Sequence, residues 1–453
     1  MKFFLAVFSA LLFLTDLSAQ PAHRYWIFLR DKGPVQGELS PAVSEFALAK
    51  RQRKNIPTGD FTDLPVYSGY TAILKQTGIR IHHRSRWFNA VSADLSGIPA
   101  STIRALPFVR DIQPVRVLRS SGEVRPAPSV LFKPSDDFYG PSDNQARMIG
   151  IPELHDQGFY GQGVRIALFD TGFRLEHDAL QHITVVAAYD FINNDKVVDN
   201  QAGDSPAQYE HGTRVLSVIG GYSPGNLVGP AWKSEYLLAK TENIASETHM
   251  EEDNWVAAAE WADSLGADSL GADIISSSLG YSTFDKGQVS YTYEDMDGKT
   301  TIITRAANMA VEKGISVFNS AGNEGSLSWH YITAPADGFN VIAVGGLNPD
   351  GSLWNGSSRG PTYDGRIKPD VVAQGGSVYN VSPATTDRYE TATGTSLSCP
   401  LAAGSGAIIL SVNPNLTPLE LRDLMIRSAT HYLEPDNDTG YGTIDLVTLS
   451  GSR

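Results

Sequence analysis

The stretch Val164-Arg165-Ile166-Ala167-Leu168-Phe169-Asp170-Thr171-Gly172 is a short apolar run that ends in a polar turn. Similar apolar runs follow it at 184–191, 236–240, 273–277, 315–319 and 340–344. Helical spacing of apolar residues lies between some of them, at 251–265 and 301–313. Short, nearly continuous apolar strands that alternate with helices indicate a parallel sheet covered by helices on both faces. From about residue 150 onward we therefore predict an α/β fold with a mainly parallel sheet.

Polar residues stand at the ends of three of these predicted strands. They are Asp170-Thr171-Gly172, Ser278-Leu279-Gly280 and Ser320-Ala321-Gly322-Asn323. Open parallel sheets bind their ligands outside the carboxyl ends of the strands. We therefore expect a carboxylate, an extended polar strand end and an amide to meet at one edge of the sheet.

Two predicted helices begin with residues suited to nucleophilic chemistry. His211-Gly212-Thr213 opens a helix that continues over 214–219, and Gly394-Thr395-Ser396 opens another over 397–410. A serine at a helix N-terminus has its hydroxyl near free backbone N–H groups and the positive end of the helix dipole. This environment favours the oxyanion that forms when a hydroxyl attacks a carbonyl carbon.

These side chains can supply the nucleophile, the base and the supporting groups of a serine hydrolase. The hydroxyl of Ser396 is a weak nucleophile near neutral pH and needs an adjacent base, for which His211 is suited. The imidazole needs a carboxylate that sets its tautomer and stabilises its cation, and Asp170 can do this. The side-chain N–H of Asn323 and the backbone N–H of Ser396 could hold the oxyanion. We predict Asp170, His211, Ser396 and Asn323 as catalytic residues.

The same motifs, taken together and in this order, resemble the subtilisin-like serine proteases, the subtilases of peptidase family S8. The serine motif runs Gly394-Thr395-Ser396-Leu397-Ser398-Cys399-Pro400, and further matches stand at 357–361 and 368–373. The resemblance covers about residues 145–447. It implies a three-layer sandwich with a mainly parallel sheet and helices on both faces. It also implies a secreted endopeptidase that forms an acyl-enzyme and requires no cofactor for its chemistry.

The resemblance also implies substrate-binding residues. Ser278, Leu279 and Gly280 are expected to pair with the substrate backbone as an added β-strand. Ala321 and Gly322 are expected to border the pocket for the residue before the scissile bond. The implied partners are polypeptide substrates, and we expect a monomer.

The N-terminus has the pattern of a secretory signal. Lys2 precedes the apolar run 3–14, and Leu17-Ser18-Ala19 then offers a small residue for cleavage. We predict a signal peptide over 1–19, because the apolar run is too short to span a bilayer. No later stretch reaches about 18 consecutive apolar residues, so we predict no membrane span.

Residues 20–118 form a separate small α+β unit in this interpretation. Strands are predicted at 25–29, 79–82, 90–95 and 109–115, with helices within 61–78 and at 98–106. The unit looks like the family's inhibitory propeptide, a ferredoxin-like domain that assists folding, blocks the cleft and is removed by self-cleavage. The Pro- and Ser-rich start of 119–140 predicts a linker and processing region, and 141–450 is predicted to be the catalytic domain.

Charge is divided unevenly along the chain. The 453 residues carry a formal net charge of −14, which argues against binding to nucleic acid. Residues 20–120 carry +8 and residues 121–453 carry −22. We hypothesise that the basic propeptide and the acidic catalytic domain attract each other and associate faster at low salt.

The sequence departs from the family pattern in three places. The serine motif commonly continues Met-Ala-Ala-Pro, whereas this chain has Leu397-Ser398-Cys399-Pro400. Cys399 is the only cysteine, so it excludes disulfides, and we predict a small buried core residue. Gln374 stands where a proline usually follows Ala373. The tandem repeat ADSLG-ADSLG at 262–271 leaves the register of the substrate-binding strand open.

Calcium binding is a further property that the resemblance suggests, since acidic domains offer the oxygen ligands that calcium takes. The segment 294–298 is the best local candidate, and Asp195, Asp199 and Asp204 are others. A solvated loop is the simpler explanation of each. We assign no metal ligands from the sequence.

Other functions stay open at this stage. Asp170-Thr171-Gly172 and Asp438-Thr439-Gly440 both fit the signature of aspartic proteases, although the second does not follow a buried strand. An esterase of the α/β-hydrolase type would need G-x-S-x-G and the order Ser, Asp, His, and the chain departs from both. A secreted binding protein that retains the fold without the activity is the remaining alternative, although no member of the triad is missing.

Overall fold

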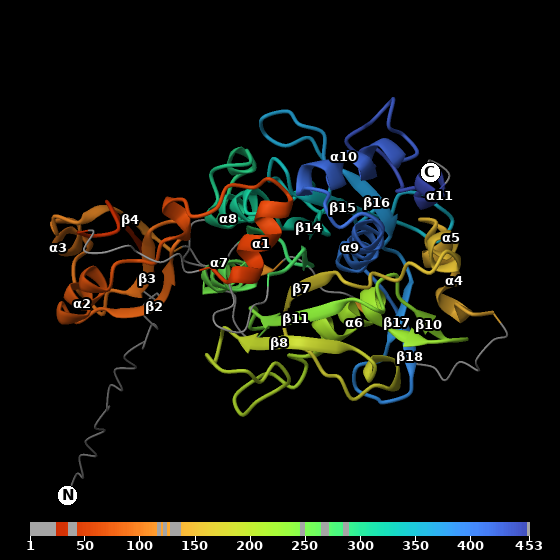
Figure 1. Ribbon diagram of the computed structural model, residues 1–453, viewed down its shortest axis with the longest axis horizontal. Helices are drawn as coiled ribbons and strands as arrows, with labels where there is room; N and C mark the ends of the chain where they lie inside the picture. Colours follow the sequence, from red (N-terminus) through yellow and green to blue (C-terminus); the bar gives the residue numbers. More distant parts are fainter. Residues whose placement is uncertain are drawn as a thin grey trace, which may run out of the picture.

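The computed structural model describes residues 24–34, 43–115, 119–120, 125–126, 137–244, 250–263, 271–283 and 290–450. The predicted signal peptide, most of the predicted linker and positions 264–270 of the tandem repeat lie outside the described residues. Figure 1 shows a small lobe built from the N-terminal strands and a larger lobe built from the rest of the chain.

The larger lobe is built on a seven-stranded sheet with the order β16-β15-β14-β12-β7-β11-β8. All neighbouring strands of this sheet run parallel. The strands are β7 Arg165–Asp170, β8 Thr184–Asp190, β11 Glu235–Lys240, β12 Ile274–Ser277, β14 Ser316–Ser320, β15 Ile342–Leu347 and β16 Val371–Gln374. The predicted mainly parallel sheet is therefore confirmed. Only β16 falls outside the six predicted runs.

Helices cover both faces of this sheet, which gives the three predicted layers (Figure 1). They are α6 Glu210–Gly220 and α9 Thr395–Val412 on one face, and α7 Met250–Asp263 and α8 Ile302–Glu312 on the other. The residues of β7 are apolar on both sides because each side of the strand faces a different core. Ile166 and Leu168 belong to the core under α6 and α9, whereas Ala167 and Phe169 belong to the core under α7 and α8.

Helix α9 runs through the core of the larger lobe. It packs against α6 and against strands β12, β14, β15 and β16. Among the described residues it is the one helix that is long and apolar enough to cross a membrane, and 89% of it is buried inside the fold. Its apolar composition is thus explained by its place in the core.

The small lobe is a four-stranded antiparallel sheet with the order β2-β3-β1-β4. Its elements are β1 Arg24–Leu29, α2 Ser68–Gln76, β2 Arg80–Ser85, β3 Ala90–Asp94, α3 Ala100–Arg104 and β4 Val109–Pro114. This succession is that of a ferredoxin-like fold, as predicted.

The two faces of the small sheet pack against different partners. Ile27 lies in a core with Leu74 of α2 and Ile103 of α3. Trp26 and Phe28 point the other way, because side chains alternate along a strand, and they join the core formed with α7 and α8. The small lobe is therefore held to the larger lobe by an apolar contact.

Helix α1 (Glu45–Arg53) is an element that the sequence patterns do not predict. Its basic residues interrupt any apolar stripe, although Ser44 caps its start by accepting a hydrogen bond from Ala47 N–H at 3.2 Å. Figure 1 shows α1 apart from the sheet of the small lobe, lying against the larger lobe.

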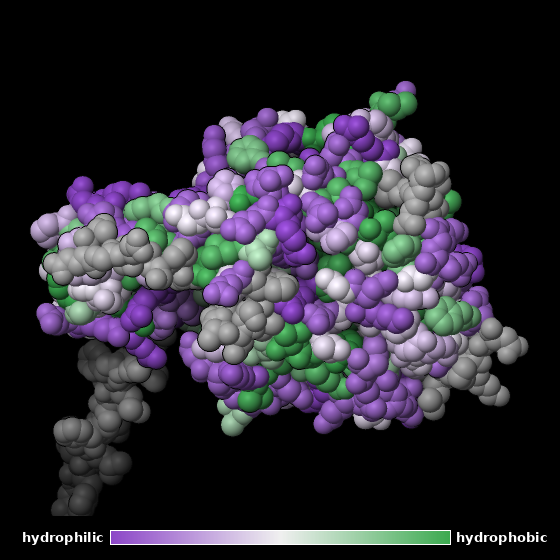
Figure 2. Space-filling model, in the orientation of Figure 1, coloured by the Kyte–Doolittle hydropathy of each residue, from purple (hydrophilic) through white to green (hydrophobic). Residues whose placement is uncertain are grey.

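Short elements complete the fold. They are β5 Arg119–Ser120, β6 Arg125–Pro126, β9 Tyr222–Ser223, β10 Leu227–Val228, β13 Tyr281–Thr283, β17 Val378–Val381, β18 Tyr389–Thr393, α4 Asp143–Arg147, α5 Ile151–Asp156, α10 Pro418–Ser428 and α11 Leu446–Ser450. Figure 2 shows a mostly hydrophilic surface, with a hydrophobic area where the edge strand β8 lies in Figure 1. Residues 185–189 of β8 are half-buried.

Candidate active site

Asp170 and His211 meet where β7 ends and α6 begins. His211 Nδ1 lies 2.6 Å from Asp170 Oδ1, which also accepts the Thr171 N–H at 2.7 Å. The Asp170 side chain is fully buried, and that of His211 is 17% exposed. Because Nδ1 donates its proton to the carboxylate, Nε2 of the neutral ring is free to accept a proton.

A glycine allows this close approach. A Cβ atom on Gly212 would lie 2.2 Å from the carbonyl oxygen of Gly172. Gly212 is buried in the first turn of α6, and Gly172 belongs to the polar turn after β7. The absence of a side chain therefore lets α6 start directly against the turn that carries Asp170.

Ser396 lies in the first turn of α9, beside the end of β12. Its hydroxyl donates to the carbonyl oxygen of Ser278 at 3.3 Å, and the Ser278 hydroxyl donates to the carbonyl oxygen of Ser396 at 2.8 Å. Strands β12 and β7 are neighbours, with Ser277 opposite Phe169. Ser278 therefore follows β12 at the same level at which Asp170 ends β7.

The hydroxyl of Ser396 is not hydrogen-bonded to His211 in this arrangement of the described residues. Catalytic hydrogen bonds are often long or poorly aligned before substrate binds, and they tighten in the substrate complex. Rotation about the Cα–Cβ bond would turn the hydroxyl away from Ser278. Asp170 contacts His211, Ser396 contacts the strand end at Ser278, and the neighbouring strands β7 and β12 carry these two pairs at the same edge of the sheet.

The amide of Asn323 is oriented by the residue before the serine. Asn323 Oδ1 accepts hydrogen bonds from both the backbone N–H and the hydroxyl of Thr395, each at 2.9 Å. The amide oxygen is thus engaged, and within the described residues the amide N–H₂ group donates to no other group. A free donor next to the N-terminus of α9 is what stabilisation of an oxyanion requires.

The three predicted substrate-strand residues follow β12 as an extended segment. Leu279 is 4% exposed, and its carbonyl oxygen already accepts from Asn319 Nδ2 at 2.8 Å. Ser278 is held by Ser396, and Gly280 leads into β13. β13 pairs antiparallel with β5, so a segment of this chain already lies along it as an added strand.

Ala321 and Gly322 form the first part of the loop after β14. Ala321 N–H donates to Val344 O at 2.9 Å, which keeps the loop close to β15. Gly322 has a φ of +110°, and a Cβ there would lie 2.8 Å from the hydroxyl of Ser358. Ser358 also accepts the Glu324 N–H at 3.0 Å, so it holds the loop on both sides of Asn323.

Two supporting residues were not assigned a role from the sequence. Thr395 enters the sequence prediction only within the helix start Gly394-Thr395-Ser396, and Ser358 only within the motif at 357–361. Thr395 is adjacent to Ser396, so its place in the motif was a usable signal. The contact between Ser358 and Glu324 joins residues 34 positions apart and leaves no local pattern.

Cys399 is buried on α9, as predicted. Burial raises the pKa of its thiol to about 12, so the thiol is neutral at neutral pH. Its Sγ lies 3.7 Å from Ser277 O. A neutral, enclosed thiol is a core residue rather than a second nucleophile.

The acidic loops that were candidates for calcium have partners within the protein. Asp204 pairs with the buried Lys240 at 2.6 Å, and Asp199 pairs with Arg174 at 3.1 Å. Asp295 accepts the Thr292 N–H at 2.7 Å as part of a capping box. Within the described residues no three acidic, histidine or cysteine side chains gather as a metal site. These residues do not fit a calcium site, and we assign none.

The second Asp-Thr-Gly copy does not resemble the first in its surroundings. The Asp438 side chain is 52% exposed and pairs with Arg359 at 3.2 Å, whereas Asp170 is buried. Aspartic proteases need two buried carboxylates that share a proton. The exposed Asp438 does not supply the second one.

Comparisons with known proteins identify the family of this chain. The chain matches the subtilase family model over residues 161–442, and the Bacteroidota propeptide domain of peptidase S8 over residues 24–127. Subtilisin E of Bacillus subtilis (strain 168) is 27% identical over 376 residues, which covers 83% of this chain and 84% of subtilisin E. Subtilisin of Bacillus pumilus is 31% identical over 301 residues, which covers 66% of this chain and 94% of that protein.

The fold also matches a solved structure. Fervidolysin from Fervidobacterium pennivorans superposes with a TM-score of 0.62 at 21% identity, over 95% of this chain. The match spans 61% of the fervidolysin chain. The chain therefore belongs to the subtilase family, and it is a subtilisin-like serine protease with an N-terminal propeptide domain.

Proposed function

We propose that this protein is a secreted serine endopeptidase that cleaves polypeptides with the triad Asp170, His211 and Ser396. The observation that carries the proposal is the 2.6 Å contact between His211 Nδ1 and Asp170 Oδ1. Asp170 ends β7, and the neighbouring strand β12 leads into Ser278, which is hydrogen-bonded to Ser396. A buried carboxylate in this position stabilises the imidazolium that forms during the reaction.

The reaction proceeds in two halves. Ser396 Oγ attacks the scissile carbonyl carbon while His211 Nε2 takes the hydroxyl proton. The carbonyl oxygen becomes an oxyanion that accepts hydrogen bonds from Asn323 Nδ2 and the Ser396 backbone N–H. The C–N bond then breaks, His211 gives its proton to the leaving amine, and the acyl group remains on Ser396. A water molecule, deprotonated by His211, hydrolyses the acyl ester and restores Ser396.

The precursor contains a signal peptide over 1–19, an inhibitory propeptide over 20–118, a linker over 119–140 and the catalytic domain over 141–450. The substrate backbone is bound by Ser278, Leu279 and Gly280. Ala321 and Gly322 border the pocket for the substrate residue before the scissile bond. The mature enzyme is an extracellular or periplasmic monomer. The chemistry of the family needs no cofactor.

Self-cleavage occurs between residues 120 and 125 of the linker. Two strand pairs support this. β5 (Arg119–Ser120) pairs with β13, which follows the substrate-binding segment, and β6 (Arg125–Pro126) pairs with β18, which leads into Gly394-Thr395-Ser396. β13 follows the segment that Ser396 contacts, and β18 leads directly into the helix start that carries Ser396. The peptide bond that reaches Ser396 is therefore expected between them.

Replacement of the nucleophile tests the proposal. The Ser396→Ala chain should remain a precursor of full length minus the signal peptide, when purified and followed by gel electrophoresis. Ser411→Ala is a matched control on the same helix, because its hydroxyl only donates to Ile408 O at 2.7 Å, and it should mature normally. N-terminal sequencing of the mature wild-type protein should give a start between 121 and 125.

Two results would contradict the proposal. One is normal maturation of purified Ser396→Ala. The other is an activity that peaks below pH 4, which would indicate an aspartic mechanism, because a base such as His211 works only when it is unprotonated.

A further inference from the structure

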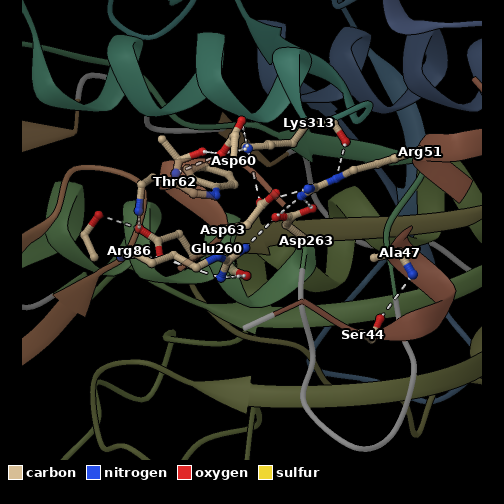
Figure 3. Close-up of polar contacts among 12 residues, drawn as sticks. Ser44, Ala47, Arg51, Asp60, Thr62, Asp63, Arg86, Glu260, Asp263 and Lys313 are labelled. Atoms are coloured by element: carbon tan, nitrogen blue, oxygen red, sulfur yellow. Dashed lines mark hydrogen bonds and ion pairs between the residues drawn. The ribbon is translucent and has the colours of Figure 1, made fainter. Parts of the chain in front are cut away.

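Helix α1 contacts the catalytic domain at the end of the central sheet opposite to Ser396. Its partners lie before β12 and β14, at the amino ends of these strands, whereas the candidate active site lies at the carboxyl ends. We call residues 43–64, which contain α1 and the loop after it, the clasp. Figure 3 shows the polar contacts of the clasp.

Arg51 is the centre of the clasp and is 1% exposed. Its Nη2 donates to both oxygens of Asp263, at the end of α7, at 2.5 and 2.6 Å. Its Nη1 donates to Asp63 of the clasp at 2.8 Å, and its Nε donates to Lys313 O at 3.2 Å. The guanidinium group therefore joins the end of α7, the end of α8 and the clasp itself (Figure 3).

In these ion pairs the cation comes from the catalytic domain in some cases and from the clasp in others. Lys313 of the catalytic domain, with a side chain 5% exposed, pairs with Asp60 at 2.9 Å and with Asp63 at 3.1 Å. Lys50 of the clasp pairs with Asp273 at 2.7 Å. Each domain thus supplies cations and carboxylates, and this alternation fits only one arrangement of the two surfaces.

The clasp also touches the start of the strand that leads to the substrate-binding segment. Asp273 directly precedes β12 and is bonded to both neighbouring strands. Its N–H donates to Arg165 O at 2.8 Å, and its carbonyl oxygen accepts Ser316 N–H at 2.9 Å. Lys50 binds the side chain of this residue, so the clasp stays attached to the rigid sheet rather than to a loose loop.

We propose that the clasp is a docking site additional to the apolar contact of the small lobe with α7 and α8, and that it keeps the cleaved propeptide on the catalytic domain independently of the active-site cleft. This inference rests on the proposed self-cleavage. Cleavage breaks the covalent link near Ser396 and leaves the clasp contacts intact. A partner bound at two linked sites dissociates far more slowly than from either site alone, because a segment that dissociates from one site stays close to it and binds again. Release of the propeptide then requires the clasp to open.

The test uses the full chain and a matched pair of variants. Arg51→Ala removes the central guanidinium, while Asp263 keeps its pair with Arg86 and Asp63 keeps its pair with Lys313. Arg53→Ala removes the same kind of side chain from the same helix, where it is exposed. After self-cleavage, size-exclusion chromatography and peptide hydrolysis report how fast the propeptide fragment leaves. Loss of a hydrogen bond to a charged group corresponds to roughly a tenfold or greater change in an equilibrium constant, so release from Arg51→Ala should be at least about tenfold faster. Arg53→Ala should match the wild type.

Release of the fragment at the wild-type rate from Arg51→Ala would overturn the proposal. If this variant fails to accumulate, Asp60→Asn provides a milder change, because Asp60 is 47% exposed and loses only its pair with Lys313. Release should then be about threefold to tenfold faster, and an unchanged rate would again contradict the clasp.

A second readout separates the clasp from the proposed cleavage. In the Ser396→Ala background no self-cleavage is expected, and hydrogen exchange of the α1 amides can be measured on the intact precursor. Arg51→Ala should speed this exchange at least tenfold relative to Arg53→Ala, and equal exchange would contradict the clasp. Cleavage of the Ser396→Ala chain would count against the proposed function alone, because the exchange comparison does not depend on catalysis.

Discussion

At the residue scale, Thr395 decides where the amide of Asn323 points. Both its N–H and its hydroxyl donate to Asn323 Oδ1, so the N–H₂ end is turned away from them. An oxyanion donor acts through its orientation as well as its presence, since only a preorganised dipole stabilises the developing charge. Ser396 depends on the same residue indirectly, because Thr395 begins helix α9.

A pair of substitutions at Thr395 tests this orientation. Thr395→Val removes the hydroxyl bond to Asn323 and the bond that the hydroxyl accepts from Gly322 N–H at 3.2 Å. It should lower kcat about 10- to 30-fold, as expected for two hydrogen bonds, with little change in KM. Thr395→Ser keeps the hydroxyl and should stay close to the wild type. Asn323→Ala should lower kcat by roughly 100- to 1,000-fold, the effect of removing one oxyanion donor. Steady-state kinetics on a peptide substrate would decide, and equal kcat values for the Val and Ser variants would contradict the role of Thr395.

At the element scale, the start of α6 packs on the turn after β7 without room for a side chain. The absent Cβ of Gly212 would lie 2.2 Å from Gly172 O, well inside van der Waals contact. Gly212→Ala should therefore push α6 away from the turn and lengthen the contact between His211 and Asp170.

The expected result for Gly212→Ala is a large loss of self-cleavage with a retained fold. A misplacement of about 1 Å at a catalytic group costs about 100-fold in rate, so precursor cleavage should slow by about that factor. The first-order rate of cleavage on gels, together with the thermal unfolding midpoint, would measure both effects. Cleavage within threefold of the wild-type rate would show that α6 tolerates the methyl group.

The elements also differ in how well the sequence predicts them. The six predicted strands of the central sheet are present, because residues buried on both faces produce an unbroken apolar run. Strand β16 is not predicted as a strand because its residues overlap the family motif at 368–373. Helix α1 is missed for a different reason: Lys50 and Arg51 face a charged partner surface, so its buried side is not apolar.

At the scale of the whole molecule, one histidine, His83, lies in the contact between propeptide and catalytic domain. His83 Nε2 lies 2.9 Å from Asn254 Oδ1 of α7, and burial lowers the pKa of His83 to about 4. The free imidazole has a pKa near 6.5. The contribution of His83 to docking is therefore present above about pH 6.5 and is lost as the pH falls towards 4.

A comparison of variants isolates this effect. In the Ser396→Ala precursor, the unfolding midpoint should fall more steeply between pH 6.5 and pH 4.5 with His83 than with His83→Gln, which retains an N–H donor and does not titrate. The comparison is necessary because burial also raises the pKa of Asp253 to about 7, and this carboxyl group favours docking as the pH falls. Parallel pH profiles for the two chains would refute the role of His83.

The overall charge division has a local counterpart in the same contact. Propeptide cations Arg24, Lys50, Arg51 and Arg86 pair with carboxylates of the catalytic domain. The hypothesis that net charge speeds docking stays a prediction. The ion pairs in the contact are largely buried, and salt screens buried pairs little. Salt should therefore act on the association rate more than on release.

By itself, the sequence determined the class of fold and the candidate chemistry. Apolar periodicity and strand-end motifs are local, and parallel strands bring their carboxyl ends to one edge, so Asp170, His211, Asn323 and Ser396 could be named in advance. Only the tertiary structure decided which way the Asn323 amide points and that Arg51 binds Asp263, 212 residues away. Such contacts join side chains that are distant along the chain. Their existence depends on how whole elements pack, and no local pattern records them.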